Sequence, residues 1–329
     1  MCEAAVKFLV KASAWLAKET PWFITAVAVA AFFAPSAFGW VRGNVQTGIL
    51  GVIMLTMGMT LTTDDFRALA ARPFDIAVGA VAQYALMPLI AFSLCHALGL
   101  PRAVGVGLVL VGVCPGGVSS NIMSFLCKGD VAFSVGMTTV TTLLAPVATP
   151  FLMQLLAGEM VEIDALGMFR SVLLVTLMPV VLGFLLNHSL GRREGYRRTM
   201  QIMPGVAVVG LACIVGGVVS AQGSHFASSG AIVFAAVLLH NSLGYALGYT
   251  TGVAFRFSKA KKRTVAIEVG MQNAGLATVL ATRHFPALPE AAVAAAVSCM
   301  WHSISGAFLA GLFNALDSWF DRHSRKAEG

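Results

Sequence analysis

The sequence predicts an all-α membrane protein with ten transmembrane helices arranged as two inverted five-helix repeats. Hydrophobic residues make up 57% of the 329 residues and charged residues only 11%, whereas soluble domains are about 25% charged. Long apolar runs follow one another along the chain, which excludes a water-soluble core and indicates a protein that crosses the bilayer. Two of these runs are interrupted at corresponding positions, and this symmetry predicts the repeat.

Ten apolar runs reach or approach the ~20 residues that cross ~30 Å of hydrocarbon. They occupy residues 20–41, 46–62, 73–95, 102–127, 131–157, 167–189, 201–221, 228–255, 261–283 and 289–316. Residues 1–19 mix lysines with apolar side chains and lack the continuous apolar region of a signal peptide. We therefore expect an amphipathic N-terminal segment that lies on the membrane surface. Residues 317–329 follow the last run as an expected cytoplasmic tail.

The basic residues predict the orientation of the chain. If the ten runs alternate in direction, only four of the 22 lysines and arginines fall on one side of the membrane, namely Arg42, Arg102, Arg170 and Arg283. Since cytoplasmic loops carry the excess of positive charge, we expect a multi-pass inner-membrane protein with both termini in the cytoplasm. The net charge of +7 is then a topology signal and not a nucleic-acid-binding surface. Nothing in the sequence indicates an obligate protein partner, and the six scattered cysteines indicate neither a metal site nor a disulfide framework.

The fourth and ninth runs are the interrupted ones. The fourth contains C-P-G-G-V-S-S-N at 114–121, and the ninth contains E-V-G-M-Q-N-A-G at 268–275. Proline and paired glycines release backbone hydrogen bonds that hydrocarbon cannot satisfy, so such segments must line a cavity or be buried in protein. Because each half has five spans, the two interrupted helices enter the membrane from opposite sides. This pattern is typical of the central site of an inverted-repeat transporter.

Glu268 is the only acidic residue that lies inside an apolar run rather than at its edge. A carboxylate deep in the bilayer costs roughly 2.5–3.5 kcal/mol unless a partner offsets it, and no lysine or arginine lies at mid-span. Oxygen-bearing side chains accompany the two breaks or lie in neighbouring runs: Gln83, Ser120, Asn121, Ser134, Thr138 and Gln272. Such oxygens suit a hard monovalent cation, whereas the nitrogen and sulfur ligands that zinc or copper prefers are not clustered. We therefore expect Glu268 to bind a cation.

Several of these side chains also have a structural interpretation. Ser134 and Thr138 could hydrogen-bond to their own helix, and Gln83 could tie two helices together. His240 is expected to be structural, whereas His302, in M-W-H-S-I-S-G, could either bind a ligand or only pack. These alternatives remain open at the level of sequence.

Taken together, the breaks and the carboxylate predict coupled transport. The helices that restart after each break direct free N–H groups toward the midplane, which favours an anion there. We expect inward sodium flow coupled to uptake of an organic anion; the alternative is a proton-coupled carrier in which Glu268 titrates. An intramembrane hydrolase that uses Ser119 or Ser120 with a histidine is not supported, because no acid is placed to orient the histidine and G-x-S-x-G is absent. We expect no enzymatic activity.

Five motifs in register resemble those of the bile acid:sodium symporter family, particularly its bacterial ten-span homologues. They are Q-Y-A-L-M-P at 83–88, C-P-G-G-V-S-S-N, K-G-D-V-A-F-S-V, E-V-G-M-Q-N-A-G and W-H-S-I-S-G, and the resemblance extends from about Trp22 to Leu316. It implies a panel domain of residues 20–62 and 167–221 and a core domain of residues 73–157 and 228–316. Helices four and nine would cross at their breaks within the core domain.

The resemblance also implies the ligands of two sodium ions and of a substrate. The first sodium site would use Ser120, Asn121, Ser134, Thr138 and Glu268, and the second Gln83, Glu268, Val269, Met271 and Gln272. Val118, Ser119, Asn273, His302 and Ser303 would lie beside the substrate. Bacterial relatives often carry threonine at the position of Val118 and asparagine at that of Ser303, which predicts altered hydrogen bonding to the substrate. The implied substrate is a small organic anion, either a bile acid or a small monocarboxylate such as pantoate.

Overall fold

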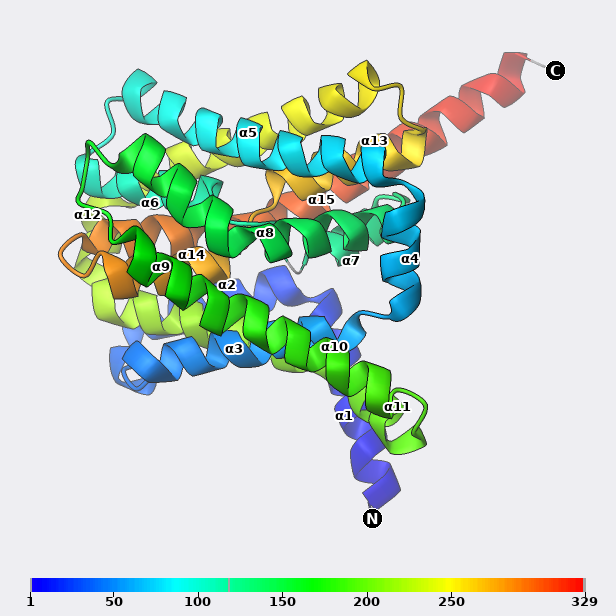
Figure 1. The fold of residues 1–329 in the computed structure, drawn as a ribbon, viewed down its shortest axis with the longest axis horizontal. Helices are drawn as coiled ribbons and strands as arrows, with labels where there is room; N and C mark the ends of the chain where they lie inside the picture. Colours follow the sequence, from blue (N-terminus) through cyan, green and yellow to red (C-terminus); the bar gives the residue numbers. More distant parts are fainter. Residues whose placement is uncertain (1, 118, 328–329) are drawn as a thin grey trace.

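The computed structural model describes residues 2–117 and 119–327, and over these residues the chain is helical without a β-strand (Figure 1). The α-helices are α1 (Cys2–Lys18), α2 (Thr20–Phe33), α3 (Gly43–Thr60), α4 (Thr63–Ala71), α5 (Pro73–Ala97), α6 (Arg102–Gly112), α7 (Ser120–Leu126), α8 (Val131–Ala157), α9 (Ala165–Val172), α10 (Met178–Leu190), α11 (Glu194–Met200), α12 (Met203–Ala254), α13 (Lys259–Gly270), α14 (Ala274–His284) and α15 (Pro289–Ala327). A 3-10 turn, η1 (Pro35–Ala37), follows α2, and a π-helical turn, η2 (Leu173–Leu177), joins α9 to α10 without a gap.

The helices are long and apolar enough for a multi-span membrane protein. Six helical segments of the described chain meet both criteria: 73–97, 131–157, 165–190, 194–226, 228–254 and 289–319. Two bent pairs meet them jointly, α1 with α2 at 85° and α3 with α4 at 73°, which raises the number to eight. Helices α6, α7, α13 and α14 are each too short by themselves, because the two sequence breaks divide them.

Three elements differ from the expected boundaries. Helix α12 continues through the expected connection between residues 221 and 228, and only Gln222 leaves helical geometry, with φ −124° and ψ 24°. Helix α15 continues to Ala327, so the expected tail begins as helix. The connection between residues 62 and 73 contains α4, which starts with a capping box because Thr62 and Asp65 each accept the other's backbone N–H.

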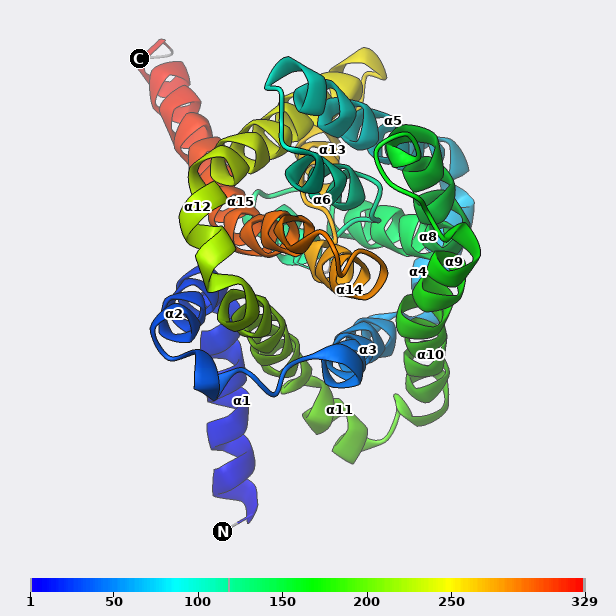
Figure 2. The same ribbon diagram turned by 90° about the vertical axis from the view of Figure 1, so that its left-hand side faces the viewer.

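Two groups of helices lie against each other, as Figures 1 and 2 show. One group contains α2, α3, α10 and the first half of α12, and the other contains α5–α8, the second half of α12 and α13–α15. Helix α1 projects from the first group and is fixed to it by Ser13, whose hydroxyl donates to Ile202 O over 3.1 Å and accepts from Gly205 N over 2.9 Å. The bend at Gln222 carries α12 from one group to the other, so a single helix connects both.

Candidate cation site and cavity

The two breaks pair with each other through their backbones. Gly117 N donates to Met271 O over 2.9 Å, Asn273 N donates to Pro115 O over 2.8 Å, and Gly116 forms an antiparallel bridge with Gln272. The backbone groups in these contacts are therefore satisfied by protein, as a site remote from water requires.

The glycine pair of the first break permits this close approach. A Cβ atom on Gly117 would lie 2.8 Å from Gln272 O, and one on Gly116 would lie 3.1 Å from Glu268 Oε2. Since real Cβ atoms essentially never approach an oxygen to less than 3.0 Å, a larger residue at position 117 must displace the second break. The motif C-P-G-G thus brings one backbone against the other and against the carboxylate.

Glu268 is 1% exposed and accepts hydroxyl hydrogen bonds on both carboxylate oxygens. Ser120 Oγ donates to Oε1 over 2.6 Å, and Ser134 Oγ also donates to this oxygen. Thr138 Oγ1 donates to Oε2 over 2.8 Å. Side chains from α7 and α8 therefore converge on the carboxylate from α13, and no ion pair within the described part of the chain includes it.

Asn121 completes the set expected for the first sodium site. Its Oδ1 lies 2.8 Å from Ser134 Oγ and 3.4 Å from Thr138 Oγ1. Ser124 Oγ lies 3.1 Å from Ser134 Oγ and was missed by sequence reasoning. The available signal was its spacing, because Ser124 follows Ser120 by four residues and so faces the same side of α7.

A second group of oxygens surrounds Gln83, which is 1% exposed. Gln83 Nε2 donates to Gln272 Oε1 over 2.6 Å, and Gln272 Nε2 donates to Val269 O over 2.8 Å. Gln83 Oε1 is buried and has no partner among the described residues. An unsatisfied buried acceptor costs about 1–3 kcal/mol, and a bound cation would remove that cost. Met271 O, also expected in this site, accepts a hydrogen bond from Gly117 N of the first break and keeps a second lone pair.

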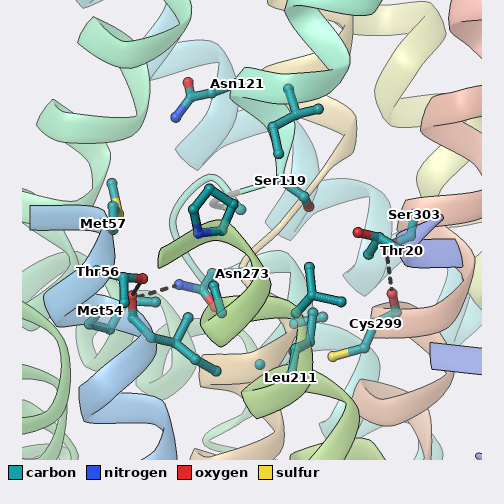
Figure 3. A pocket seen from close by; sticks show the side chains of 18 of the residues that line it. Thr20, Met54, Thr56, Met57, Ser119, Asn121, Leu211, Asn273, Cys299 and Ser303 are labelled. Carbon is teal, nitrogen blue, oxygen red and sulfur yellow. Dashed lines mark hydrogen bonds between the residues drawn. The ribbon is translucent and has the colours of Figure 1, made fainter. Parts of the chain in front are cut away.

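A cavity of about 350 Å³ lies beside the paired breaks, between the two groups of helices (Figure 3). Figure 3 shows Met54 and Thr56 on one side of it, Cys299 and Ser303 on the other, and Asn273 between them. Its wall is mostly apolar. The lining also includes Thr20, Thr60, Met203 and Pro204. The cavity therefore extends from the breaks toward the start of α2, the end of α3 and the start of α12.

Four of the five residues expected beside the substrate line this cavity: Ser119, Asn273, His302 and Ser303. Val118, the fifth, lies outside the described residues. Asn273 Oδ1 caps α14 by accepting from Leu276 N over 3.0 Å, while its Nδ2 faces Met54 Sδ at 3.7 Å. Thr56 and Met54 of α3 were missed, because α3 is predominantly apolar and its sequence does not indicate which face lies toward the breaks.

The two membrane histidines have different surroundings. His302 Nδ1 lies 3.3 Å from Gln272 O, so it donates to the carbonyl of the second break while the residue lines the cavity. His240 Nε2 donates to Met87 O over 3.0 Å, and His240 is fully buried away from the cavity lining. His240 therefore ties α12 to α5, in agreement with a structural role.

The opposite end of the same interface is held by polar contacts. Thr282 Oγ1 donates to Gln46 Oε1 over 2.9 Å, and His284 Nε2 lies 2.9 Å from Ser171 Oγ. The first contact connects α14 to α3 of the facing group, and the second connects α14 to α9, which continues through η2 into α10 of that group. The cavity is thus extended toward one end of the molecule and bounded by side-chain hydrogen bonds toward the other.

A multi-span helical protein with two paired helix breaks, a buried carboxylate among hydroxyls and an adjacent cavity has the features of a secondary transporter. The family model described as "Sodium Bile acid symporter family" matches residues 47–229, and the chain belongs to this family. The resemblance found in the sequence motifs is therefore confirmed.

Relatives with assigned names agree with this membership. The chain is 41% identical over 288 residues to the uncharacterized sodium-dependent transporter YocS of Bacillus subtilis (strain 168), with 88% of each chain covered. It is 42% identical over 280 residues to the probable chloroplastic sodium/metabolite cotransporter BASS1 of Arabidopsis thaliana, covering 85% of this chain and 69% of the relative. The chain is therefore a membrane protein of a sodium-dependent transporter family, and these relatives are named as transporters and not as enzymes.

Proposed function

We propose that this chain is a sodium-coupled symporter that imports an organic anion by alternating access. The observation that carries the proposal is the carboxylate of Glu268, which is buried beside the cavity, surrounded by hydroxyls and without a basic partner among the described residues. A buried carboxylate is costly unless a cation or other partner offsets it, and oxygen ligands of this kind suit sodium.

The hydroxyl arrangement favours sodium over the proton-coupled alternative. Ser120, Ser134 and Thr138 each place a hydroxyl within hydrogen-bond reach of Glu268, and together they serve both of its oxygens, which suits an ionised carboxylate. When sodium binds, these hydroxyls can rotate and present oxygen lone pairs to the ion, because a hydroxyl both donates and accepts. A protonated carboxyl group would itself donate from one oxygen, so a hydroxyl at that oxygen would have to accept the hydrogen bond instead of donating it.

We assign two sodium ions to the site. Ser120, Asn121, Ser134, Thr138 and Glu268 would hold the first. Gln83 and Glu268 side chains, with oxygen atoms from Val269, Met271 and Gln272, would hold the second. The unpartnered Gln83 Oε1 supports this second assignment. Because both sets adjoin the paired breaks, the ions would order the backbone that contacts the substrate, and this provides the coupling.

The proposed topology has ten spans in two inverted halves of five. Counted in chain order, they are α2, α3, α5, α6 with α7, α8, α9 with α10, the first part of α12, the second part of α12, α13 with α14, and α15. The panel domain would contain residues 20–62 and 167–221, and the core domain residues 73–157 and 228–316. Both termini would lie in the cytoplasm of a cell with this protein in its inner membrane, and α1 would lie along the membrane surface, which its 85° bend from α2 supports.

The cavity supports a monocarboxylate with an apolar body as substrate. Ser119, Asn273 and Ser303 offer a few polar contacts within a mostly apolar wall, and the N-terminus of α14 would favour the carboxylate. A bile acid and a small pantoate-like acid both have this chemistry. With the proposed orientation, Thr20 and Thr60 are at the cytoplasmic ends of their helices, so the cavity is open inward.

The test is a thermal-unfolding measurement on the purified chain in detergent, with sodium replaced by potassium at constant ionic strength and with a panel of small carboxylates. Sodium at 100 times its Kd should stabilise the protein by about 2.7 kcal/mol for each site that it fills, and the transported acid should add to this only in sodium. Glu268→Gln should remove both effects, whereas Glu290→Gln, whose carboxylate pairs with His225 outside the site, should retain them. Unchanged sodium stabilisation in Glu268→Gln would refute the proposal. Uptake at low pH without sodium would support the proton-coupled carrier.

A further inference from the structure

We propose that Thr264 is a positioning residue that sets the register between the helices that hold the cation. The turn between α7 and α8 packs around Arg263 and Thr264 and so maintains this register. This inference rests on the proposed function, because it concerns the geometry of the proposed sodium site. Neither residue contacts the carboxylate of Glu268 in the described hydrogen bonds.

The register follows from two contacts one helical turn apart. Thr264 Oγ1 accepts from Asp130 N over 2.8 Å and lies 3.2 Å from Asp130 O, to which it can donate. Four residues further along each of the two helices, Ser134 donates to Glu268. Four residues correspond to about 6 Å of helix rise, so the contact between Thr264 and Asp130 lies directly one turn before the contact that forms the site. A shift of α13 along α8 by even one residue would break both.

The turn between α7 and α8 is shaped to receive these two residues of α13. Cys127 O, at the end of α7, accepts from Arg263 Nη1 over 3.0 Å. Gly129 has no side chain where one would collide, because a Cβ atom there would lie 2.6 Å from Thr264 Oγ1. Lys128 between them adopts a φ of +54°, which L-residues rarely occupy. The turn therefore keeps a strained conformation that fits around α13.

This turn also determines where the hydroxyl ligands lie. It joins the end of α7, which carries Ser120 and Asn121, to the start of α8, which carries Ser134. Asp130 caps α8 by accepting from Phe133 N over 3.0 Å. One contact surface on α13 thus fixes both ligand-bearing helices relative to Glu268.

The side chain of Arg263 is held in place by α15, so the turn between α7 and α8 contacts a guanidinium group with a fixed position. Its guanidinium donates from Nη1 and Nη2 to the two carboxylate oxygens of Asp317 over 2.9 and 2.6 Å. It also lies 4.9 Å from the ring centroid of Phe313, and Arg263 is 4% exposed. A bidentate pair of this kind has a defined geometry, and it connects the start of α13 to α15.

Loss of the contact between Thr264 and Asp130 should lower the affinity for sodium, although all the proposed ligands remain in the chain. Removing the Thr264 hydroxyl leaves every proposed ligand in the chain but removes the contact that fixes α13 against the start of α8. Each lost hydrogen bond is equivalent to roughly a tenfold change in an equilibrium constant or less. We therefore expect Thr264→Val to raise the sodium concentration that gives half of the maximal stabilisation by about tenfold.

The experiment is a sodium titration of the unfolding temperature of the purified full-length chain, with potassium as the balancing ion. Thr264→Ser keeps the hydroxyl and should restore the half-saturating concentration to that of the unmodified protein. Thr139→Val is the matched control, since the Thr139 hydroxyl is buried on α8 and, within the described part of the chain, bonds to Val135 O of its own helix over 2.7 Å. It should leave the sodium titration unchanged. The unfolding temperature in potassium alone reports any general loss of stability, which a purely structural role would change without moving the titration.

Each outcome decides the inference. A normal half-saturating concentration in Thr264→Val overturns it, while sodium stabilisation of the unmodified protein still supports the proposed function. Loss of any sodium effect in the unmodified protein refutes the proposed function first. If Thr264→Val does not fold, Gly129→Ala forces the same two segments apart and should weaken sodium binding. Failure of both variants to fold, with Thr264→Ser folded, would assign the contact to folding and overturn the inference.

Discussion

Replacing Gln83 with leucine should separate the two roles that its position allows. If Gln83 is a sodium ligand, Gln83→Leu removes one ion site but leaves the fold intact. If Gln83 only ties α5 to the second break through Gln272, the substitution removes a contact between these segments and leaves the sodium response unchanged.

The structure gives the expected size of each effect. Without sodium, the substitution removes the hydrogen bond from Gln83 Nε2 to Gln272 Oε1, which is worth about 0.5–1.5 kcal/mol. It also leaves Gln272 Oε1 without this donor. It also removes Gln83 Oε1, an unpartnered buried acceptor that costs about 1–3 kcal/mol. These contributions oppose each other, so stability in potassium should change by about 1 kcal/mol or less. In sodium, the loss of one of two sites should reduce the Hill coefficient from about two toward one.

The assay is a sodium titration of both unfolding temperature and uptake into proteoliposomes. Asn187→Leu is the control, because Asn187 of α10 is an amide that donates to Leu61 O over 2.7 Å within the other group of helices, away from the breaks. It should leave the sodium cooperativity unchanged. A Gln83→Leu variant that unfolds several kcal/mol more easily in potassium, yet retains the normal Hill coefficient, would refute the ligand assignment.

Two further substitutions probe the breaks and the closed end of the interface. Gly117→Ala should weaken sodium stabilisation and destabilise the protein by about 1–3 kcal/mol, because its Cβ would lie 2.8 Å from a carbonyl oxygen of the other break; Gly223→Ala, with only ordinary contacts at 3.9 Å, is the control in the same unfolding assay. Thr282→Val removes the contact with Gln46 and should open the cavity to the other side more often. The check is the rate at which a membrane-impermeant reagent added outside labels the variant Ser303→Cys, which should be faster when Thr282→Val is also present. An unchanged labelling rate would contradict this assignment.

The central part of the site could be predicted from sequence because its residues would cost free energy in a bilayer unless they had partners. An acidic residue in an apolar run and a Pro-Gly-Gly break both demand partners there, and Glu268, Gly116 and Gly117 do lie together. The spacing of four between Ser134 and Thr138 correctly placed both on one face of α8. Local spacing along one helix is fixed by helical geometry and needs no knowledge of the fold.

Features that depend on how helices meet could not be predicted in this way. Hydropathy marks contact with lipid but not the direction of a chain, so the continuous helix through Gln222 was interpreted as a connection between two spans. Met54 and Thr56 line the cavity only because α3 faces the breaks, and an apolar helix gives no signal of that orientation. The contact between Thr264 and Asp130 likewise requires the register of two helices that are 134 residues apart in the chain.

The backbone pairing between the two breaks has a consequence for how the protein can move. Interrupted helices are commonly regarded as flexible points, but here the amides of Gly117 and Asn273 are each bonded to the opposite segment. Their hydrogens should therefore exchange with deuterated water as slowly as those of an intact helix. A conformational switch must then carry both segments as one rigid unit, with the bending confined to connections such as that at Gln222.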